Sequence, residues 1–254
     1  MIKRILLIVL IFTGFVINAQ DLAYKPGEHF KFRIHYGFFN AGYATLDLST
    51  GRFKGKDLYH AVGKGWTVGM SRWFMKIKDR YESYFDSTNA PHRFVRKVDE
   101  GGYIIDRELH FDKQNQEVLV IDEKENTAKT YTTTKQIFDM VSVFYYLRNY
   151  DTTNMKVGDK ISVDMFFDNE VYPFKLKFLG KDVVRTNKGK VRALKFRPIV
   201  QSGRVFKEDE SLTVWVSDDE NKMPLLIKAK LMIGSLKASL TEFKGLKYPV
   251  NYKK

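Results

Sequence analysis

Apolar and polar residues alternate along most of this chain, and this alternation strongly limits the fold. Within residues 28–36, Phe30, Phe32, Ile34 and Tyr36 occupy every second position, and charged or histidine side chains stand between them. Successive side chains of a β-strand point to opposite faces of a sheet, so this period indicates half-buried strands. Because the pattern recurs through the chain, we expect an all-β, mainly antiparallel protein of about twelve strands.

Short polar turns join the expected strands into a meander, as at Gly101-Gly102 and Asn187-Lys188-Gly189. The alternation in Trp73–Phe85 predicts one strand of roughly 40 Å. Strands of that length favour a large curved sheet or half-barrel over a compact sandwich. No Pro/Ser/Gly-rich linker and no repeat interrupts the pattern, so residues 21–254 are predicted to form a single antiparallel β domain.

One segment departs from the strand period. Residues 134–149 carry apolar side chains at i, i+3, i+4, i+7 and i+10, which is the pattern of an amphipathic α-helix. Thr133 or Thr134 is the expected N-cap. We expect this helix to pack on the concave face of the sheet. The apolar positions are Ile137, Met140, Val141, Phe144 and Leu147.

The N-terminus has the pattern of a secretory signal peptide over residues 1–20. Basic residues 1–4 precede an apolar run over 5–17, and 18–20 are small or polar. That run is shorter than the roughly 20 residues of a spanning helix, although an uncleaved anchor is the alternative. The chain has no cysteine, so it cannot carry the acylated cysteine of a lipoprotein. We therefore expect an exported protein, periplasmic or secreted, not a lipoprotein, and without a transmembrane segment after signal cleavage.

The formal net charge of +13 favours anionic partners. Outside the cytoplasm nucleic acid is not expected, and anionic lipid, lipopolysaccharide or acidic glycan are the better candidates. Basic residues recur on the polar faces of the expected strands, and neighbouring strands would join them into one positive face. The alternative is that the charge only serves solubility, on an ordinary hydrated sheet face. These residues are Lys31, Arg33, Lys76, Lys78, Arg80, Lys175, Lys177, Lys195, Arg197, Lys228 and Lys230.

The sequence contains no recognisable catalytic, cofactor or metal motif: a phosphate loop, a His-Glu-x-x-His helix and a Gly-x-Ser-x-Gly elbow are all missing. The acidic runs Glu208–Glu210 and Asp218–Glu220 suit solvated turns, because the two carboxylates of a glycosidase come from separate strands. An enzyme would need acids such as Asp106, Glu108 or Asp168 to converge in a cleft, with Asp164 as a further candidate. We expect no cofactor and no metal.

Three motifs in order resemble an exported bacterial family known as domain of unknown function 3108. They are Asn40–Leu46, Asp139–Arg148, and Trp215–Pro224 followed by Lys228–Leu240. The resemblance implies a Gram-negative envelope protein and covers nearly all of the chain after residue 20. It brings no activity and no catalytic residues with it.

The leading hypothesis is a non-catalytic periplasmic binding or carrier protein for an anionic amphiphile or glycan. By analogy of fold, it would be similar to periplasmic lipoprotein carriers, with an apolar cavity and with Arg148 holding an anionic group. Equally, the aromatic residues could fill a core and Arg148 could stabilise the helix end. Two alternatives are an assembly factor that binds another envelope protein through an exposed sheet edge, and a hydrolase acting on glycan or lipid. The candidate cavity residues are Trp73, Met75, Phe144, Tyr145, Tyr146 and Trp215.

Overall fold

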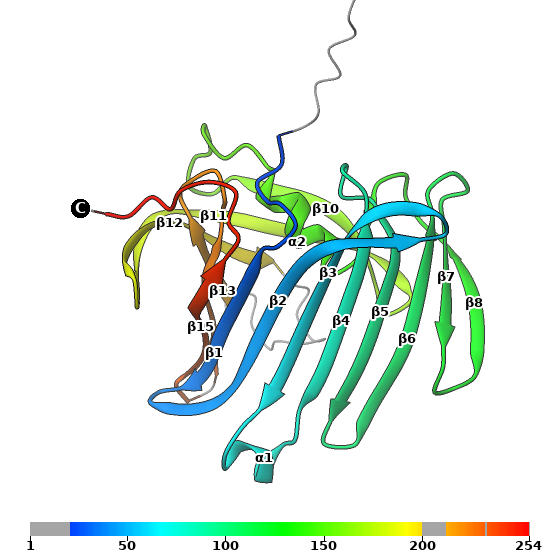
Figure 1. Ribbon diagram of the computed structural model, residues 1–254, viewed down its shortest axis with the longest axis horizontal. Helices are drawn as coiled ribbons and strands as arrows, with labels where there is room; N and C mark the ends of the chain where they lie inside the picture. The colour runs from blue at the N-terminus through cyan, green and yellow to red at the C-terminus, as the bar shows by residue number, and fades with distance from the viewer. Residues whose placement is uncertain (1–20, 200–211, 232, 254) are drawn as a thin grey trace, which may run out of the picture.

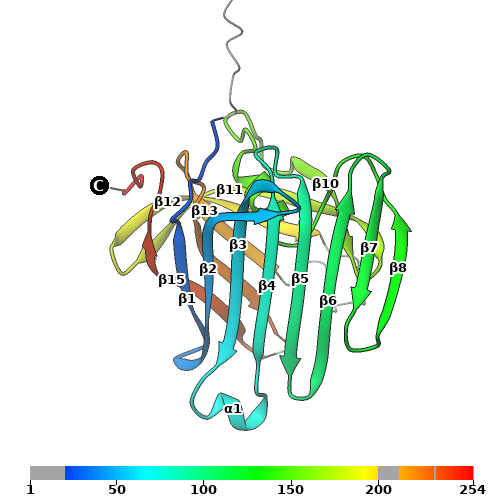
Figure 2. The same cartoon turned by 45° about the vertical axis from the view of Figure 1, so that its right-hand side comes forward.

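The structure is a computed structural model that describes residues 21–199, 212–231 and 233–253. The predicted signal peptide and the acidic run Glu208–Glu210 lie outside the described residues. Within the described ranges, fifteen strands form one sheet, which confirms the prediction of an all-β protein (Figures 1 and 2). The prediction of about twelve strands was too low.

The first half of the chain is an antiparallel meander. Its one helical turn, α1 (Ser71–Phe74), lies between the third and fourth strands. The strands are β1 (His29–Tyr36), β2 (Phe39–Phe53), β3 (Lys56–Thr67), β4 (Lys78–Phe85), β5 (Pro91–Glu100), β6 (Tyr103–Asp112), β7 (Glu117–Asp122) and β8 (Thr127–Thr132).

The second half begins with β9 (Ile137–Phe138) and α2 (Ser142–Arg148) and continues as a second meander. β9 runs parallel to β10, and every other neighbouring pair is antiparallel. Its remaining strands are β10 (Lys160–Phe167), β11 (Glu170–Thr186), β12 (Gly189–Ile199), β13 (Leu212–Ser217), β14 (Pro224–Lys230) and β15 (Ser235–Lys244).

The two halves meet where β1 pairs with β15 in the middle of the sheet, so the strand order runs from β8 to β1 and then from β15 to β9. Figure 1 shows the long strands β2–β6 as one curved wall, the strands β10–β13 as another, and α2 between them at one end. This arrangement confirms the predicted curved sheet with a helix on its concave face. A hydrophobic core forms between α2 and the sheet, where Tyr145 of α2 packs with Phe85 of β4 and with Phe166 of β10.

The predicted helix over residues 134–149 is wrong in its first half. Only Ser142–Arg148 is helical, and Ile137–Phe138 forms β9 instead. The reason is a reciprocal cap at Asp139. Its carboxylate accepts the Ser142 N–H at 2.8 Å, and the Ser142 hydroxyl accepts the Asp139 N–H at 3.0 Å. Such a cap satisfies the free N–H groups of a first helical turn, so the helix begins after Asp139.

The predicted strand over Trp73–Phe85 is also shorter than expected. β3 ends at Thr67, Gly69 adopts a positive φ of 55°, and α1 follows before β4 begins at Lys78. The alternation of apolar and polar residues extends through this connection, but Trp73 and Met75 are exposed and do not pack against the sheet. The first residues of the predicted strand therefore belong to a protruding connection.

Candidate functional site

A pocket of about 480 Å³ opens where three connections meet at the α2 end of the sheet. The β4–β5 turn, the β6–β7 turn and the segment that leads into β9 surround it. The backbone N–H of Thr133 donates to the carbonyl of Gln116 at 2.7 Å, which fixes this segment against the β6–β7 turn. The lining residues are Thr88, Ala90, Pro91, Phe111, Asp112, Lys113, Glu117, Lys135, Gln136, Ile137 and Phe138.

Two aspartates shape the turns beside the pocket. Asp86 accepts the backbone N–H groups of Thr88 and Ala90. Burial opposes ionisation of Asp86, but hydrogen bonds from His92, Thr88 and the backbone outweigh it and lower its pKa to about 2. Asp112 accepts the N–H groups of Gln114 and Asn115 in the β6–β7 turn. Both carboxylates are therefore engaged in holding the turns.

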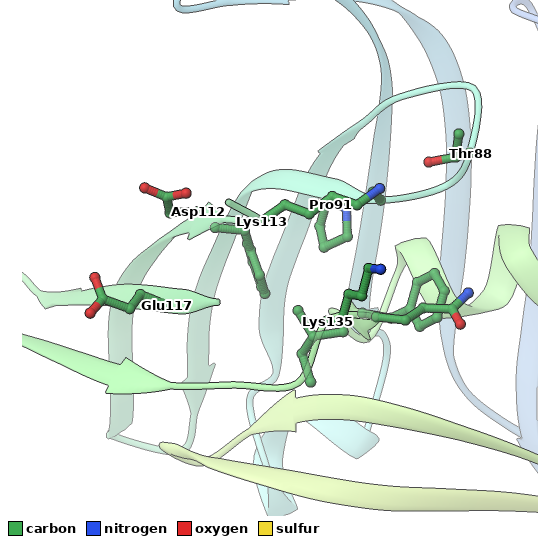
Figure 3. A pocket seen from close by; sticks show the side chains of 11 residues that line it. Thr88, Pro91, Asp112, Lys113, Glu117 and Lys135 are labelled. Carbon is green, nitrogen blue, oxygen red and sulfur yellow. The ribbon is translucent and has the colours of Figure 1, made fainter. Parts of the chain in front are cut away.

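The pocket combines an apolar floor with two cationic side chains. Ile137 and Phe138 of β9 are buried beneath it. Figure 3 shows Lys113 and Lys135 reaching across the pocket, whereas the carboxylates of Asp112 and Glu117 point away from it. Neither lysine forms an ion pair with a residue that the structure describes. The pocket therefore suits a ligand with an apolar part, which would contact the floor, and an anionic part, which would contact the two ammonium groups.

Sequence reasoning did not find these two lysines. The sequence pattern predicted Lys113 to lie in a turn and Lys135 to lie in the first turn of a helix. No local signal brings them together, because their proximity depends on the path of the chain after β8. The one usable signal was Asp139-x-x-Ser142, which places the helix start later and leaves Lys135 in a connection.

The predicted cavity residues do not converge. Tyr145 is fully buried in the core, and Phe144 packs partly buried beside it. Tyr146 packs against a second core cluster around Phe138. Trp215 belongs to a third cluster, and its indole N–H donates to Asp182 at 2.9 Å.

Trp73 and Met75 are also separate from this group, since both are exposed at the opposite end of the sheet. Arg148 is buried, and its guanidinium donates to both carboxylate oxygens of Glu28 and to the carbonyls of Ala23 and Asn221. These partners fit a role in joining segments of the fold.

The predicted basic strand faces contain cations in different surroundings. Some cations of the β1–β6 side have acidic partners, as in the pairs Arg80–Glu82 and Arg93–Glu108. In the second half, Lys228 of β14 stands directly opposite Lys237 of β15 in the strand register. Like charges placed directly opposite each other on neighbouring strands repel each other.

The acids considered for a hydrolase do not form a cluster. Asp106 pairs with Lys97, Glu108 with Arg93, and Asp168 with Arg96. Asp164 lies on β10, opposite Pro173.

Within the described ranges, no three His, Asp or Glu side chains come together as metal ligands would. In the same part of the chain, no helix has the length and apolar character needed to cross a membrane.

Comparisons with known proteins place the chain beside uncharacterised families. The model of the family described as "Protein of unknown function (DUF3108)" matches residues 31–241. A comparison with curated proteins finds no match. A β-barrel-like protein of the DUF1849 family from Brucella abortus has a TM-score of 0.59 at 10% identity, over 88% of this chain and 99% of that chain. This likeness concerns the fold alone.

Two further solved structures have lower scores. A protein described as a candidate lipoprotein, from Parabacteroides distasonis, has a TM-score of 0.36 at 11% identity, over 88% of this chain and 98% of that one. A candidate exported protein with a YmcC-like fold, from Bacteroides fragilis, has a TM-score of 0.34 at 8% identity, over 87% and 97%. Scores this low carry no conclusion about this chain.

Proposed function

Because the chain belongs to the DUF3108 family of proteins of unknown function, we propose a role from its own geometry: a binding or carrier protein of the cell envelope that holds an anionic amphiphile in the pocket beside β9. The observation that carries this proposal is the placement of Lys113 and Lys135 over an apolar floor. Two ammonium groups that have no acidic partner among the described residues favour a ligand that supplies the negative charge.

The size and lining of the pocket indicate which part of the ligand it binds. About 480 Å³ lies within the range of small-molecule sites. Phe111, Ile137 and Phe138 offer apolar contact, which suits an acyl or aromatic group better than a sugar ring. The ligand class is therefore a carboxylate or phosphate joined to an apolar body. A glycan fits the lining less well.

Export from the cytoplasm belongs to the same proposal. It is supported by the basic, apolar and small-residue order of residues 1–20, which is the pattern of a cleaved signal peptide. Anionic amphiphiles are abundant in an envelope, so this location and the pocket chemistry agree. Sequencing the N-terminus of the protein isolated from its host tests this part, and retention of residues 1–20 would contradict it.

Calorimetric titration with decanoate, a carboxylate with an apolar chain, tests the binding role. Lys113→Ala/Lys135→Ala should weaken binding by at least about tenfold, because each charged contact contributes about 1.5–3 kcal/mol. The matched control is Lys64→Ala/Lys190→Ala, which removes two exposed lysines on β3 and β12, strands that do not line the pocket, and should bind like the unchanged protein. Equal affinity in the pocket variant, or equal loss in the control, would refute this assignment.

A second candidate function is assembly with another envelope protein through β8. This strand ends the sheet order and pairs only with β7 among the described strands, and most of its side chains are exposed. An unpaired edge can accept a strand from another chain. A photo-cross-linker at Ala128 should then capture one dominant protein in cells. Absence of an adduct, or the same adduct from a cross-linker at Asp57 on the β2–β3 hairpin, would count against it.

A further inference from the structure

Exposed apolar side chains gather at the end of the sheet away from α2. Figures 1 and 2 both show the β1–β2 turn, α1 and the β5–β6 turn at this end, together with the β14–β15 connection. Trp73 and Phe74 of α1 are 89% and 91% exposed, which is unusual for such large apolar side chains. We call the following residues the apolar tip: Phe38, Phe39, Met70, Trp73, Phe74 and Ile233.

Hydrogen bonds hold the apolar tip in place. The Tyr36 hydroxyl donates to the carbonyl of Ile233 at 2.8 Å, so the β1–β2 and β14–β15 connections are tied together. The N–H of Gly101 donates to the carbonyl of Lys76 at 2.8 Å, which ties the segment after α1 to the β5–β6 turn. These two links fix the backbone of four connections. The exposed tip side chains therefore project from connections that are tied to each other in pairs.

Exposed cations lie next to the apolar tip, and the described residues offer them no ion-pair partner. The exposed basic side chains next to it are Arg72, Lys76, Lys78 and Lys230, and none forms an ion pair with a described residue. The nearest acids, Asp79, Asp99 and Glu100, are half-buried on the strands behind it. Asp79 accepts the Asp99 N–H at 3.3 Å, so it is partly engaged there. Among the described residues, the exposed charge at this end is therefore positive.

We propose that the apolar tip docks this protein onto the surface of an anionic phospholipid bilayer. Trp73 and Phe74 enter the interfacial region, where aromatic side chains are stabilised, and the surrounding cations contact lipid phosphates. A protein partner would instead need a continuous, close-fitting surface, whereas these side chains project from separate turns. The bilayer covers apolar groups that protrude in this way without needing a matching shape.

This docking does not depend on the proposed ligand site. The pocket beside β9 lies at the α2 end, so membrane contact through the apolar tip leaves its mouth open to water. Lys113→Ala/Lys135→Ala should therefore bind vesicles as the unchanged protein does. Each of the two proposals can fail while the other stands.

Vesicle co-sedimentation of the exported, processed protein tests the inference. Vesicles of phosphatidylglycerol and phosphatidylcholine should bind the protein, and pure phosphatidylcholine vesicles should bind it much more weakly. Trp73→Ser/Phe74→Ser should reduce binding by at least about tenfold, because two aromatic groups no longer enter the interface. The matched control Val157→Ser/Val183→Ser removes two exposed apolar side chains elsewhere and should bind normally.

Two further readouts complete the test. Raising the salt from 50 to 500 mM should weaken binding in the unchanged protein, because lipid charges are then screened. Circular dichroism should show both variants folded, since all four substituted side chains are exposed. No binding to anionic vesicles, or the same loss in the control as in the tip variant, would overturn the proposal. A protein complex that needs Trp73 and Phe74, found without vesicle binding, would also overturn it.

Discussion

Arg148 and Glu28 form a bidentate ion pair in the interior of the protein, with Nη1–Oε1 and Nη2–Oε2 distances of 2.5 and 2.7 Å. Both residues are only 2% exposed. Arg148 ends α2, and Glu28 directly precedes β1 in the middle of the sheet. The Nε–H of Arg148 also donates to the carbonyl of Asn221, between β13 and β14. This one guanidinium therefore fixes α2 to both halves of the sheet.

Removing the arginine should destabilise the fold severely. Arg148→Ala leaves the Glu28 carboxylate buried without a counter-ion, which typically costs about 3–5 kcal/mol. Urea unfolding followed by circular dichroism measures this loss. Glu28→Gln/Arg148→Met removes both charges and should recover part of the stability.

The exposed pair Arg52–Asp57 provides the control for this prediction. Arg52→Ala breaks a hydrogen-bonded pair at the surface, where water solvates both partners, so the unfolding midpoint should hardly change. If Arg148→Ala unfolded at the same urea concentration as Arg52→Ala, the buried pair would not anchor α2.

Asp139 is the second anchor of α2. Its carboxylate accepts the N–H groups of Val141 and Ser142 and the hydroxyl of Ser83 on β4, at 2.6–2.8 Å. Asp139→Ala leaves these buried donors unsatisfied and should lower the free energy of unfolding by about 2–3 kcal/mol. Ser83→Ala removes one donor only and should cost about 1 kcal/mol. Thermal unfolding of both variants checks the order, and a larger loss for Ser83→Ala would contradict it.

The stability of the protein should be greatest in mildly acidic solution. Burial raises the pKa of Asp139 from 3.8 to about 6, and burial together with Glu100 raises that of Asp79 to about 6. At pH values between the ordinary aspartate pKa of 3.8 and the folded-state pKa of about 6, the folded state binds more protons than the unfolded state. Stability therefore falls as the pH rises from about 4 to 6. Hydrogen bonding to Arg93 lowers the pKa of Glu108 to about 2, so its contribution is lost as the pH falls below about 4.

Melting temperatures measured from pH 3 to 8 check this expectation. The curve should have its maximum near pH 4–5 and decline on both sides. Asp79→Asn should flatten the decline above pH 5, because one of the carboxyl groups responsible no longer titrates. A melting temperature that rises steadily from pH 4 to 7 would show that other groups dominate.

The strand pattern predicted most of the sheet because its signal is local. Phe30 and Phe32 are buried and Lys31 is not, as their alternation requires. The start of α2 was misplaced because Ile137 and Met140 continued the helical period by chance, whereas the cap at Asp139 decides where the helix begins. Local pattern alone does not show which of two such signals dominates.

The sites were harder to predict than the fold. Trp73 has the same residue type as the buried Trp215, yet it is exposed on a loop, so hydrophobicity did not reveal its place. Arg148 finds its partner Glu28 120 positions away in the chain, a distance at which no spacing rule applies. Lys113 and Lys135 likewise meet only through the tertiary path of the chain.

Filling the pocket should block the ligand without harming the fold. Ala90 lines the pocket and is partly exposed, so Ala90→Leu places three additional carbon atoms in the open volume. We expect at least about tenfold weaker decanoate binding in calorimetry, from lost space for the apolar body. Its melting temperature should stay within a few degrees of the unchanged protein, and normal binding at normal stability would place the ligand elsewhere.

Native mass spectrometry of the protein purified from the envelope of its host tests the binding role most directly. We expect a bound mass that organic extraction identifies as an anionic amphiphile, present in the unchanged protein and in Lys64→Ala/Lys190→Ala. The same mass should be absent or strongly reduced in Lys113→Ala/Lys135→Ala. A spectrum with the polypeptide alone, from protein that also fails to bind added decanoate, would contradict the account.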